Sequence, residues 1–317
     1  MDPNGALADI DPELIQKNPN NPRRYFNEER LDLLKTSIQE VGVLVPVIVY
    51  ERPDDPNRYV LMDGERRWRC SLDLALPTLR ANVIEAPTPL ENLLRMFNIH
   101  NVREDWPLIS VALSLREVIA LSNETGEKRL SEITGLTRAT VRRAKRLLSI
   151  PDSELELVRN EAHLDRTKQV HREDLYLEIE QAESVLRSKL PEIAAEFTRE
   201  EVIRKFAAKA ERGSLRAVTD FRDVGKLIQA EETQLIDRAT VVDAARELIN
   251  NDAVSPKTVY DDIASFAYRQ HTLSRKVQLL RGELEELEAE GSALSSDLRG
   301  QLLDLRAIID GLIGDGL

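Results

Sequence analysis

The chain of 317 residues contains one cysteine and few aromatic residues: six Phe, six Tyr and two Trp. A single thiol, Cys70, forms no internal disulfide, so a disulfide-held scaffold is excluded and a reducing compartment is indicated. No apolar run approaches the ~18 residues that a membrane-spanning helix needs. The first dozen residues are polar and acidic, unlike a secretory signal, so we expect a cytoplasmic protein that contacts no membrane.

Positive charge is also scarce over the chain as a whole. Lys and Arg number 44 against 56 Asp and Glu, and the resulting net charge of -12 argues against coating nucleic acid through an overall field. With 42% hydrophobic residues the chain can bury a sizeable core, and its length predicts two or three domains. Abundant Leu, Ala, Glu and Arg favour helix for most of these residues.

An arginine-rich stretch near the N-terminus follows a short apolar segment. Residues 59–62 predict a strand, residues 63–64 a turn and residues 66–76 a helix. The first turn of that helix carries three arginines: Arg66, Arg67 and Arg69. Backbone N–H groups at a glycine turn and a helix N-terminus favour an anion, and guanidinium groups bind phosphate bidentately, which lysine cannot do. The stretch predicts a phosphate clamp, with a solvated basic helix start as the alternative.

Positive charge gathers a second time between residues 128 and 148. Seven Lys or Arg residues stand there against one acid, Glu132, which gives a local charge of +6 (7 − 1). An acidic chain with one basic island usually makes a directed contact at that island. We therefore expect a binding surface here.

The same island has the pattern of a helix-turn-helix. Residues 130–134 predict a short helix, Gly135 ends it in a left-handed conformation, Leu136 packs into the turn and Thr137 caps the next helix. Three apolar residues at helical spacing are expected to pack the second helix down: Val141, Ala144 and Leu148. A generic helical hairpin has a similar pattern, so both interpretations stay open at this point.

The opposite face of the second helix carries side chains suited to a major groove. In such a helix the N-terminal side chains lie on base edges and the later arginines on phosphates. The candidate DNA-binding residues are Thr137, Arg138, Thr140, Arg142, Arg143 and Arg146.

Three N-terminal segments, in this order and spacing, resemble the N-terminal domain of the ParB family of chromosome and plasmid partition proteins. They match the family's N-P-x-x-P-R box (residues 18–23), its S-I-x-x-x-G-V-x-x-P segment (residues 37–46) and its G-E-R-R-x-R box (residues 64–69). The basic helix and the Arg-Leu-Leu-x-x-Pro ending at residues 146–151 resemble the DNA-binding segment of the same family. Beyond Pro151 the resemblance fades.

This resemblance implies an α+β fold in three parts. A small mixed-sheet ParB/sulfiredoxin-like domain is expected at residues 1–105, an all-α helix-turn-helix domain at residues 106–226 and a helical C-terminal region at residues 227–317. In the family the first domain takes CTP with Mg²⁺, and the arginines of the G-E-R-R-x-R box grip its phosphates. By resemblance the nucleotide-binding residues here are Arg23, Gly64, Glu65, Arg66, Arg67, Arg69 and Arg103.

One family motif is altered in this chain. The E-N-x-x-R-x-D motif, which helps to hold the magnesium and to position the nucleotide for hydrolysis, has Ile99 and His100 at its first two positions, while Arg103 and Asp105 keep register. A second match at residues 91–95 lies eight positions (99 − 91) too early. His100 is a candidate metal or phosphate ligand, with a hydrogen-bonded helix residue as the alternative. Nucleotide binding is therefore better supported than hydrolysis, and we expect at most slow CTP turnover.

Two enzyme classes associated with this fold gain little support. Sulfiredoxin has its cysteine directly after a glycine, whereas here Glu65 follows Gly64 and Cys70 lies deeper in the helix, where a small buried filler is expected. A nuclease needs carboxylates and histidines grouped for two-metal cleavage, and the sequence shows no such group.

A leucine-rich heptad pattern runs from Leu273 to Leu312 and is interrupted at Gly291 and Gln301. Charged residues such as Glu283 flank the apolar positions, as in a coiled coil. The pattern predicts self-association through a parallel zipper, or a hairpin of two helices if the chain turns near Gly291.

These features support the hypothesis of a ParB-like clamp that acts in plasmid or chromosome partition. It would be a homodimer that binds a palindromic operator in double-stranded DNA under the control of CTP, in the nucleoid- or plasmid-associated cytoplasm. By resemblance its partner is a ParA-type ATPase, although no basic N-terminal tail is evident to engage one. The alternative is a ParB-fold transcriptional or plasmid regulator that binds DNA without a hydrolysis cycle.

Overall fold

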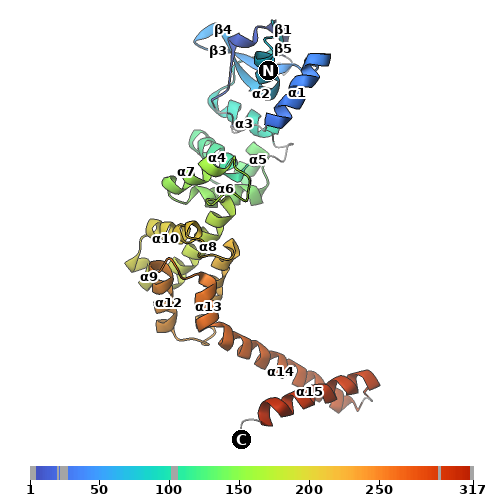
Figure 1. Ribbon diagram of the computed structural model, residues 1–317, viewed down its shortest axis with the longest axis vertical. Helices are drawn as coiled ribbons and strands as arrows, with labels where there is room; N and C mark the ends of the chain where they lie inside the picture. The colour runs from blue at the N-terminus through green and yellow to red at the C-terminus, as the bar shows by residue number, and fades with distance from the viewer. Residues whose placement is uncertain (1–4, 20, 22–27, 101–105, 292–293, 315–317) are drawn as a thin grey trace.

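The computed structural model describes residues 5–19, 21, 28–100, 106–291 and 294–314, with the backbone alone described at positions 99, 100 and 313. The molecule is elongated (Figure 1). A sheet domain lies at the N-terminal end, a column of helices follows, and two long helices lie at the C-terminal end.

The sheet at the N-terminal end is mixed. Its strands are β1 (Ala6–Ile10), β2 (Ile15–Gln16), β3 (Val47–Arg52), β4 (Asp55–Asp63) and β5 (Leu79–Ile84). They stand in the order β1-β5-β3-β4-β2, with β1–β5 and β3–β4 antiparallel and β3–β5 and β2–β4 parallel. β-branched Val47 and Val49 of β3 are fully buried in the core of the domain. The strand predicted at residues 59–62 is the second half of β4.

Three helices accompany the sheet: α1 (Glu28–Val41), α2 (Glu65–Asp73) and α3 (Pro89–His100). A short 3-10 turn, η1 (Pro12–Leu14), precedes β2. Leu31 and Ile38 of α1 pack with Cys70 of α2 in a small separate core, so the two helices lie side by side (Figure 1). The buried stripe of α1 thereby fixes the helix that carries the arginine cluster.

Helix α2 ends at Asp73, three residues before the predicted end at position 76. Ala75 adopts φ 47°, which takes the backbone out of the helical region. The N–H of Leu76 then bonds back to the carbonyl of Ser71 at 3.1 Å, the hydrogen bond of a left-handed helix end. The sequence has no glycine at this turn to signal it.

Helices fill the middle of the chain. Their bounds are α4 (Leu108–Ser122), α5 (Glu127–Thr134), α6 (Arg138–Leu148), α7 (Asp152–Glu161), α8 (Glu173–Lys189), α9 (Pro191–Glu196), α10 (Arg199–Glu211), η2 (Val218–Phe221), α11 (Arg222–Glu232), α12 (Arg238–Asn250) and α13 (Pro256–Ile263). One core runs through them from Leu93 of α3 to Ala264. The predicted limit between residues 226 and 227 falls inside α11, whose Val224 and Leu227 belong to this core. We therefore describe residues 106–264 as one helical unit.

Two helices follow the helical unit: α14 (Ser265–Glu290) and α15 (Ser296–Gly314). Gly291 ends α14 with φ 63°, so the heptad pattern is divided between two helices. No residue of α14 is buried, and Leu273 and Leu312 remain 60% and 76% exposed. The leucine pattern therefore faces solvent in the single chain.

The predicted α+β class is confirmed, with a five-stranded mixed sheet at the N-terminus and helices over the remainder. Within the ranges described, no helix combines the length and the apolar character required to cross a lipid bilayer.

Candidate phosphate and nucleic-acid sites

The first turn of α2 begins at Gly64, which has φ 100° and ψ 23°, in the left-handed region. No side chain of the described residues caps the helix there. Trp68 is the first residue whose N–H bonds to a helix carbonyl, that of Gly64 at 3.0 Å. By helix geometry the N–H groups ahead of it point out of this end, where an anion is favoured.

Alanine at Gly64 should destabilise the sheet domain by about 2–5 kcal/mol, the sum of left-handed strain and overpacking. A Cβ atom there would lie 2.7 Å from Cγ1 of Val47, which is fully buried. Gly42→Ala is the matched control, because Gly42 also has positive φ (73°) but nothing within 4 Å of its Cβ position. Urea unfolding of both variants measures the difference, and equal losses would contradict the contact with Val47.

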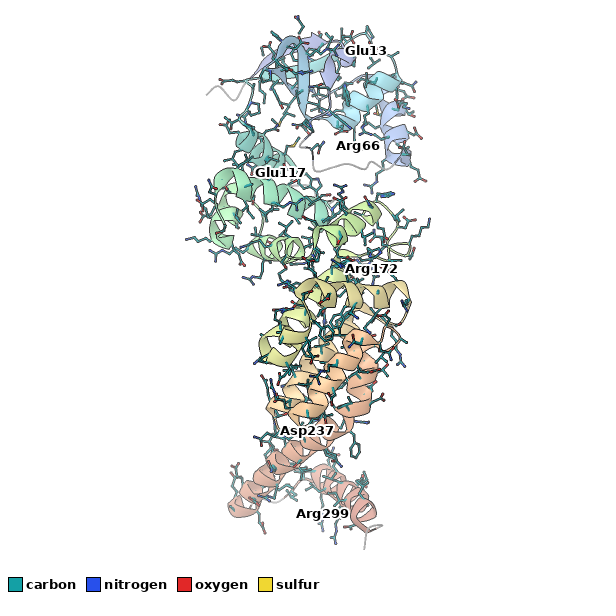
Figure 2. All side chains as sticks on the ribbon, turned by 90° about the vertical axis from the view of Figure 1, so that its left-hand side faces the viewer. Glu13, Arg66, Glu117, Arg172, Asp237 and Arg299 are labelled. Carbon is teal, nitrogen blue, oxygen red and sulfur yellow. The ribbon has the colours of Figure 1, made fainter. Side chains whose placement is uncertain are left out.

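Arg66 lies on the side of the sheet domain that faces the helical unit (Figure 2). Its Nη2 donates a hydrogen bond of 2.9 Å to the backbone oxygen of Arg30 on α1, its only bond to the described residues. A guanidinium has five N–H donors, so most of those of Arg66 remain for another acceptor. Of the three clustered arginines, Arg66 is the best placed to bind phosphate.

Arg67 is held by the protein itself, and its side chain is only 17% exposed. Its Nη1 donates to the carbonyls of Val45 (2.5 Å) and Pro46 (2.8 Å). Its Nη2 donates to Oδ2 of Asp63 at 3.1 Å. These bonds fasten the loop between α1 and β3 to the end of β4, which gives Arg67 a positioning role at this site.

Arg69 is paired with the acidic residue of its own motif. Its Nε and Nη2 donate to Oε1 of Glu65 at 3.0 and 2.5 Å, and Nδ2 of Asn21 donates to Oε2 at 2.6 Å. Glu65 is 8% exposed, so its carboxylate links the N-P-x-x-P-R box to the G-E-R-R-x-R box from a buried position. An anion that recruits Arg69 would compete with this carboxylate.

Several predicted site residues fall outside the described residues. They are Arg23, Arg103 and Asp105, together with the side chains of Ile99 and His100. Among the residues that are described, no group of three or more His, Cys, Asp or Glu side chains is arranged to hold a metal ion.

Two residues that belong to alternative interpretations of the sequence are buried: Asn92, in the second motif match at residues 91–95, and Cys70, which was compared with the sulfiredoxin cysteine. Asn92 accepts a bond from Nδ2 of Asn18 (2.9 Å) and donates one to the hydroxyl of Tyr50 (3.2 Å), so it joins α3 to the sheet domain. Cys70 is 1% exposed, its Sγ lies 3.6 Å from the carbonyl of Leu31, and burial raises its pKa. The thiol is a core filler, as predicted.

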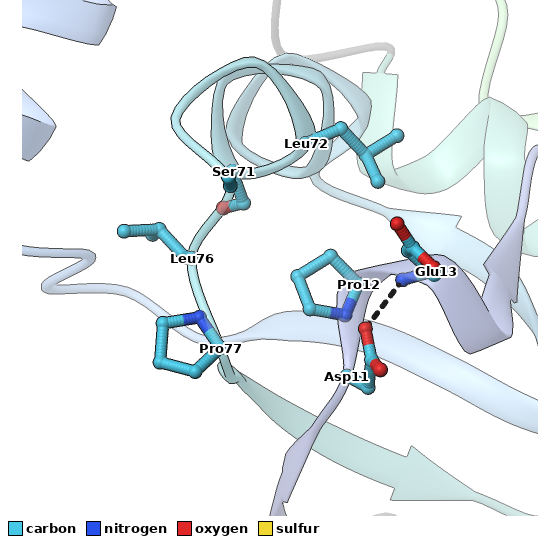
Figure 3. Close-up of a pocket in the computed structure, with 8 residues that line it drawn as sticks. Asp11, Pro12, Glu13, Ser71, Leu72, Leu76 and Pro77 are labelled. Atoms are coloured by element: carbon cyan, nitrogen blue, oxygen red, sulfur yellow. Dashed lines mark hydrogen bonds between the residues drawn. The ribbon is translucent and has the colours of Figure 1, made fainter.

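An open pocket of about 300 Å³ lies between η1 and the end of α2 (Figure 3). Its lining consists of Asp11, Pro12, Glu13, Ser71, Leu72, Ala75, Leu76 and Pro77. Glu13 stands at the outer end of the molecule, away from Arg66 (Figure 2). The lining includes two carboxylates and no cation, so this pocket does not suit phosphate.

The structure contains the helix-turn-helix geometry that the basic island predicts. Gly135 ends α5 with φ 73°, and Oγ1 of Thr137 accepts the N–H of Thr140 at 3.1 Å to cap α6. The fully buried residues of α6 are Val141, Ala144 and Leu147. The prediction of Leu148 as the third packing residue is therefore corrected to Leu147, with Leu148 only partly buried beside the core.

The outer face of α6 is basic and exposed. Arg138 and Arg143 make no hydrogen bond to the described residues and are open to solvent. Arg142 forms three hydrogen bonds of 3.0–3.3 Å to Glu127 of α5, which raise the pKa of Arg142 and lower that of Glu127. The pair is exposed, so a phosphate can replace the carboxylate at small cost. Thr137 and Thr140 stand at the helix start beside Arg138.

Arg146 is held against the rest of the helical unit. Its Nε donates to Oε2 of Glu180 at 2.6 Å, and its Nη2 donates to the carbonyl of Leu177 at 2.7 Å. Glu180 also lies 3.4 Å from Arg199 of α10. These bonds tie α6 to α8, so Arg146 fixes the angle of the basic helix. Sequence reasoning missed this because Glu180 lies 34 residues away.

Comparisons with known proteins identify a family for the N-terminal part of the chain. A model of the ParB N-terminal domain matches residues 2–102. The chromosome-partitioning protein ParB of Caulobacter vibrioides is 38% identical over 151 residues, 47% of this chain and 48% of that protein. The probable chromosome-partitioning protein ParB of Pseudomonas putida is 34% identical over 148 residues, 46% of this chain and 49% of that one. The chain thus spans about half the length of the curated relatives it matches.

Two similar solved structures are of the C-terminally truncated chromosome-partitioning protein ParB from Caulobacter crescentus. The complex with CTP-gamma-S is 30% identical, covers 54% of this chain and 92% of its own, and has a TM-score of 0.30. The complex with the centromeric parS site is 26% identical, covers 65% of this chain and 99% of its own, and has a TM-score of 0.38.

The family model covers the sheet domain and its arginine cluster, where the three N-terminal motifs also lie. On these grounds residues 2–102 form a ParB N-terminal domain, and about half of the chain is similar to chromosome-partitioning ParB proteins.

Proposed function

We propose that this chain is a sequence-specific DNA-binding protein of plasmid or chromosome partition, in which CTP bound to the sheet domain controls a dimeric DNA clamp. The observation that supports it most is the presence, in one chain with a ParB N-terminal domain, of two separate cationic surfaces. One is the N-terminus of α2 with Arg66, and the other is the exposed face of α6.

The nucleotide would lie against the first turn of α2. Arg66 has donors to offer to phosphate oxygens, the turn at Gly64 lets the backbone approach closely, and Arg67 holds the adjoining loop in place. Arg69 would bind phosphate by exchanging its bond to Glu65. Arg23 and Arg103 complete the proposed set on family resemblance alone.

CTP and magnesium are assigned on the relatives. A ParB relative is solved with CTP-gamma-S, which supports CTP as the nucleotide here. Mg²⁺ would be held largely by the phosphate oxygens, as is usual for this ion. The altered residues Ile99 and His100 favour binding over rapid hydrolysis.

The DNA-binding surface would be the exposed face of α6. Arg138 and Arg143 are free to approach base edges or phosphates, Arg142 is released from Glu127 by exchange, and Arg146 sets the angle of the helix. The set proposed from sequence also includes Thr137 and Thr140. We propose residues 1–105 as the nucleotide-binding domain and the helical unit as the DNA-binding part.

The clamp would be a homodimer that closes on a palindromic operator. The exposed leucines of α14 and α15 supply an apolar surface that a second copy can cover. A ParA-type ATPase partner and a place in the cytoplasm on the nucleoid or a plasmid are proposed from the resemblance to the ParB family. The alternative, a ParB-fold regulator without a hydrolysis cycle, is favoured only by the altered residues 99–100.

Calorimetric titration of the full chain with CTP and Mg²⁺ tests the nucleotide site. We expect binding to be lost in Arg66→Ala and kept in Arg58→Ala, since Arg58 is an exposed cation of β4 paired with Asp55. Absence of heat with any ribonucleoside triphosphate would remove the nucleotide from the proposal. CTP turnover is then measured in the presence of a duplex selected from genomic fragments. If the chain is a clamp, this DNA stimulates turnover; if it is a regulator, it binds the DNA without CTP turnover.

A further inference from the structure

The helix α12 repeats the sequence of the basic helix α6. Aligning residues 136–148 with residues 236–248, each 100 positions later, leaves a short pattern of identical residues. The seven identities are Arg238, Ala239, Thr240, Val241, Ala244, Arg246 and Leu248. The match includes the first arginine, the threonine whose N–H is capped and the buried alanine.

The two helices also begin in the same way. Oδ1 of Asp237 accepts the N–H of Thr240 at 2.9 Å, as Thr137 accepts that of Thr140 at 3.1 Å. In each helix the threonine hydroxyl bonds to the capping side chain, at 2.7 Å in α12 and 2.9 Å in α6. The first three residues and the capping residue have the same burial in both helices, and Val241 is fully buried like its counterpart.

A helix and a left-handed turn precede α12, as they precede α6. α11 packs against α12, and Gln234 has φ 58°, close to the φ of 73° at Gly135. The turn from the left-handed residue to the helix cap is one residue longer, since Gln234 to Asp237 spans three steps and Gly135 to Thr137 spans two. Residues 222–250 therefore form a second helix-turn-helix, which its charges conceal in the sequence.

The two copies differ at the positions of the basic side chains of α6. Exposed Asp243 stands where α6 has Arg143, and the buried Val242 and Ala245 stand where α6 has Arg142 and Lys145. On α9, α12, the turn before α12 and the C-terminal ends of α8 and α11, three cations stand against seven acids, for a net charge of -4 (3 − 7). These residues are Lys189, Arg238, Arg246, Glu192, Glu196, Glu231, Glu232, Asp237, Asp243 and Glu247. With this net negative charge the surface repels a phosphate backbone.

Arg238 and Arg246, the two arginines that α12 shares with α6, are bound mainly by carboxylates of the short helix α9, and Nη1 of Arg238 also donates to Glu231 of α11 at 3.3 Å. Nε and Nη2 of Arg238 donate to the two oxygens of Glu192 at 2.9 Å each. Nε and Nη2 of Arg246 donate to Glu196 at 2.6–3.0 Å, and its Nη1 donates to Asp243 at 2.9 Å. In α6, by contrast, Arg138 is open to solvent.

We propose that residues 222–250 are a masked second site for the backbone of duplex nucleic acid, in which Glu192 and Glu196 of α9 hold Arg238 and Arg246 away from phosphate. The arginine side chains are 41% and 40% exposed. Exposed pairs of this kind contribute little to stability, so replacing the two α9 carboxylates loosens the arginines without unfolding the helices. Each arginine then keeps one other acidic partner, Glu231 for Arg238 and Asp243 for Arg246. Asp237 lies toward the C-terminal end of the helical unit, far from Arg66 (Figure 2), so this surface is separate from the proposed nucleotide site.

The test removes the mask and measures binding to a duplex of random sequence. In E192Q/E196Q we expect the affinity at about 50 mM salt to rise by about tenfold and the salt slope by about 2, as two arginines each gain a phosphate contact. Fluorescence anisotropy from about 50 to 200 mM salt gives both values. E285Q/E288Q is the matched control, because it removes the same charge on exposed α14.

Adding R238A/R246A to E192Q/E196Q should abolish the gain. An equal gain in E285Q/E288Q, a gain that survives R238A/R246A, or no gain in a variant with unchanged circular dichroism would each overturn the proposal. The measurement is repeated in an R138A/R142A/R143A background, so its outcome does not depend on whether α6 binds DNA.

Discussion

Alanine at Arg138, Arg142 and Arg143 together should lower the affinity for a selected operator duplex by about a thousandfold. Each arginine that reaches a base edge or phosphate contributes about 1–3 kcal/mol, and each 1.4 kcal/mol is a factor of ten. The salt slope should fall by about 2–3, since up to three phosphate contacts disappear. The fold should survive, because the packing residues of α6 lie on its other face: Val141, Ala144 and Leu147.

The matched control removes three cations from another exposed helix, in R269A/R275A/K276A on α14. If α6 makes the contact, this control should keep nearly all of its affinity at about 0.15 M salt, where charges beyond about 8 Å are screened. Equal losses of affinity in the two triple variants would mean that binding depends only on the overall charge of the chain. Undiminished affinity in the α6 variant would place the DNA on another surface.

Local patterns were enough to predict the elements that carry both candidate sites. The strand, the glycine turn and the helix start at Gly64 follow from residues within ten positions of one another, and so do the cap at Thr137 and the turn at Gly135. Each depends on backbone chemistry that neighbouring residues decide. The end of α2 was predicted less well, because Ala75 adopts a left-handed conformation that alanine rarely signals.

The roles of individual arginines could not be predicted in the same way. Arg67 bonds to carbonyls at positions 45 and 46, and Arg146 bonds to Glu180, so each partner lies 21 to 34 positions away. A guanidinium near a phosphate site and a guanidinium that fastens a loop look alike in sequence. Only packing separates Arg66, which bonds to one backbone oxygen among the described residues, from Arg67, which bonds to Val45, Pro46 and Asp63.

The second helix-turn-helix was missed because attention to charge hides it. Its arginines at positions 238 and 246 stand among acids, so the segment lacks the net positive charge that marks residues 128–148. The available signal was the repeat at an offset of 100 positions. An internal repeat in the sequence reveals a duplicated helical motif even where the surface charges of the two copies differ.

Replacing the buried Lys209 by methionine should change how stability depends on pH. Lys209 of α10 is fully buried, and its Nζ donates to the carbonyls of Asn251 (2.6 Å) and Val254 (2.8 Å) in the turn before α13. Burial lowers its pKa from 10.5 to about 8, and the nearby charge of Asp252 offsets only part of that effect. The folded state thus releases a proton that the unfolded chain still holds.

Between pH 8 and 10.5 the unfolded state binds more protons than the folded state, so the free energy of unfolding rises with pH. Below pH 8 the charged amine imposes its full desolvation cost, about 3 kcal/mol from the size of the shift, and this cost is relieved as pH approaches 10.5. In urea unfolding, the free energy of unfolding of the wild-type chain should rise by about 3 kcal/mol relative to that of Lys209→Met between pH 7 and 10.5. Lys128→Met, at an exposed lysine of α5, sets the baseline for losing one ammonium. If the free energy of unfolding depends on pH in the same way in the wild-type chain and in Lys209→Met, the amine is solvated in the folded state. This result would contradict its burial beneath the α12–α13 turn.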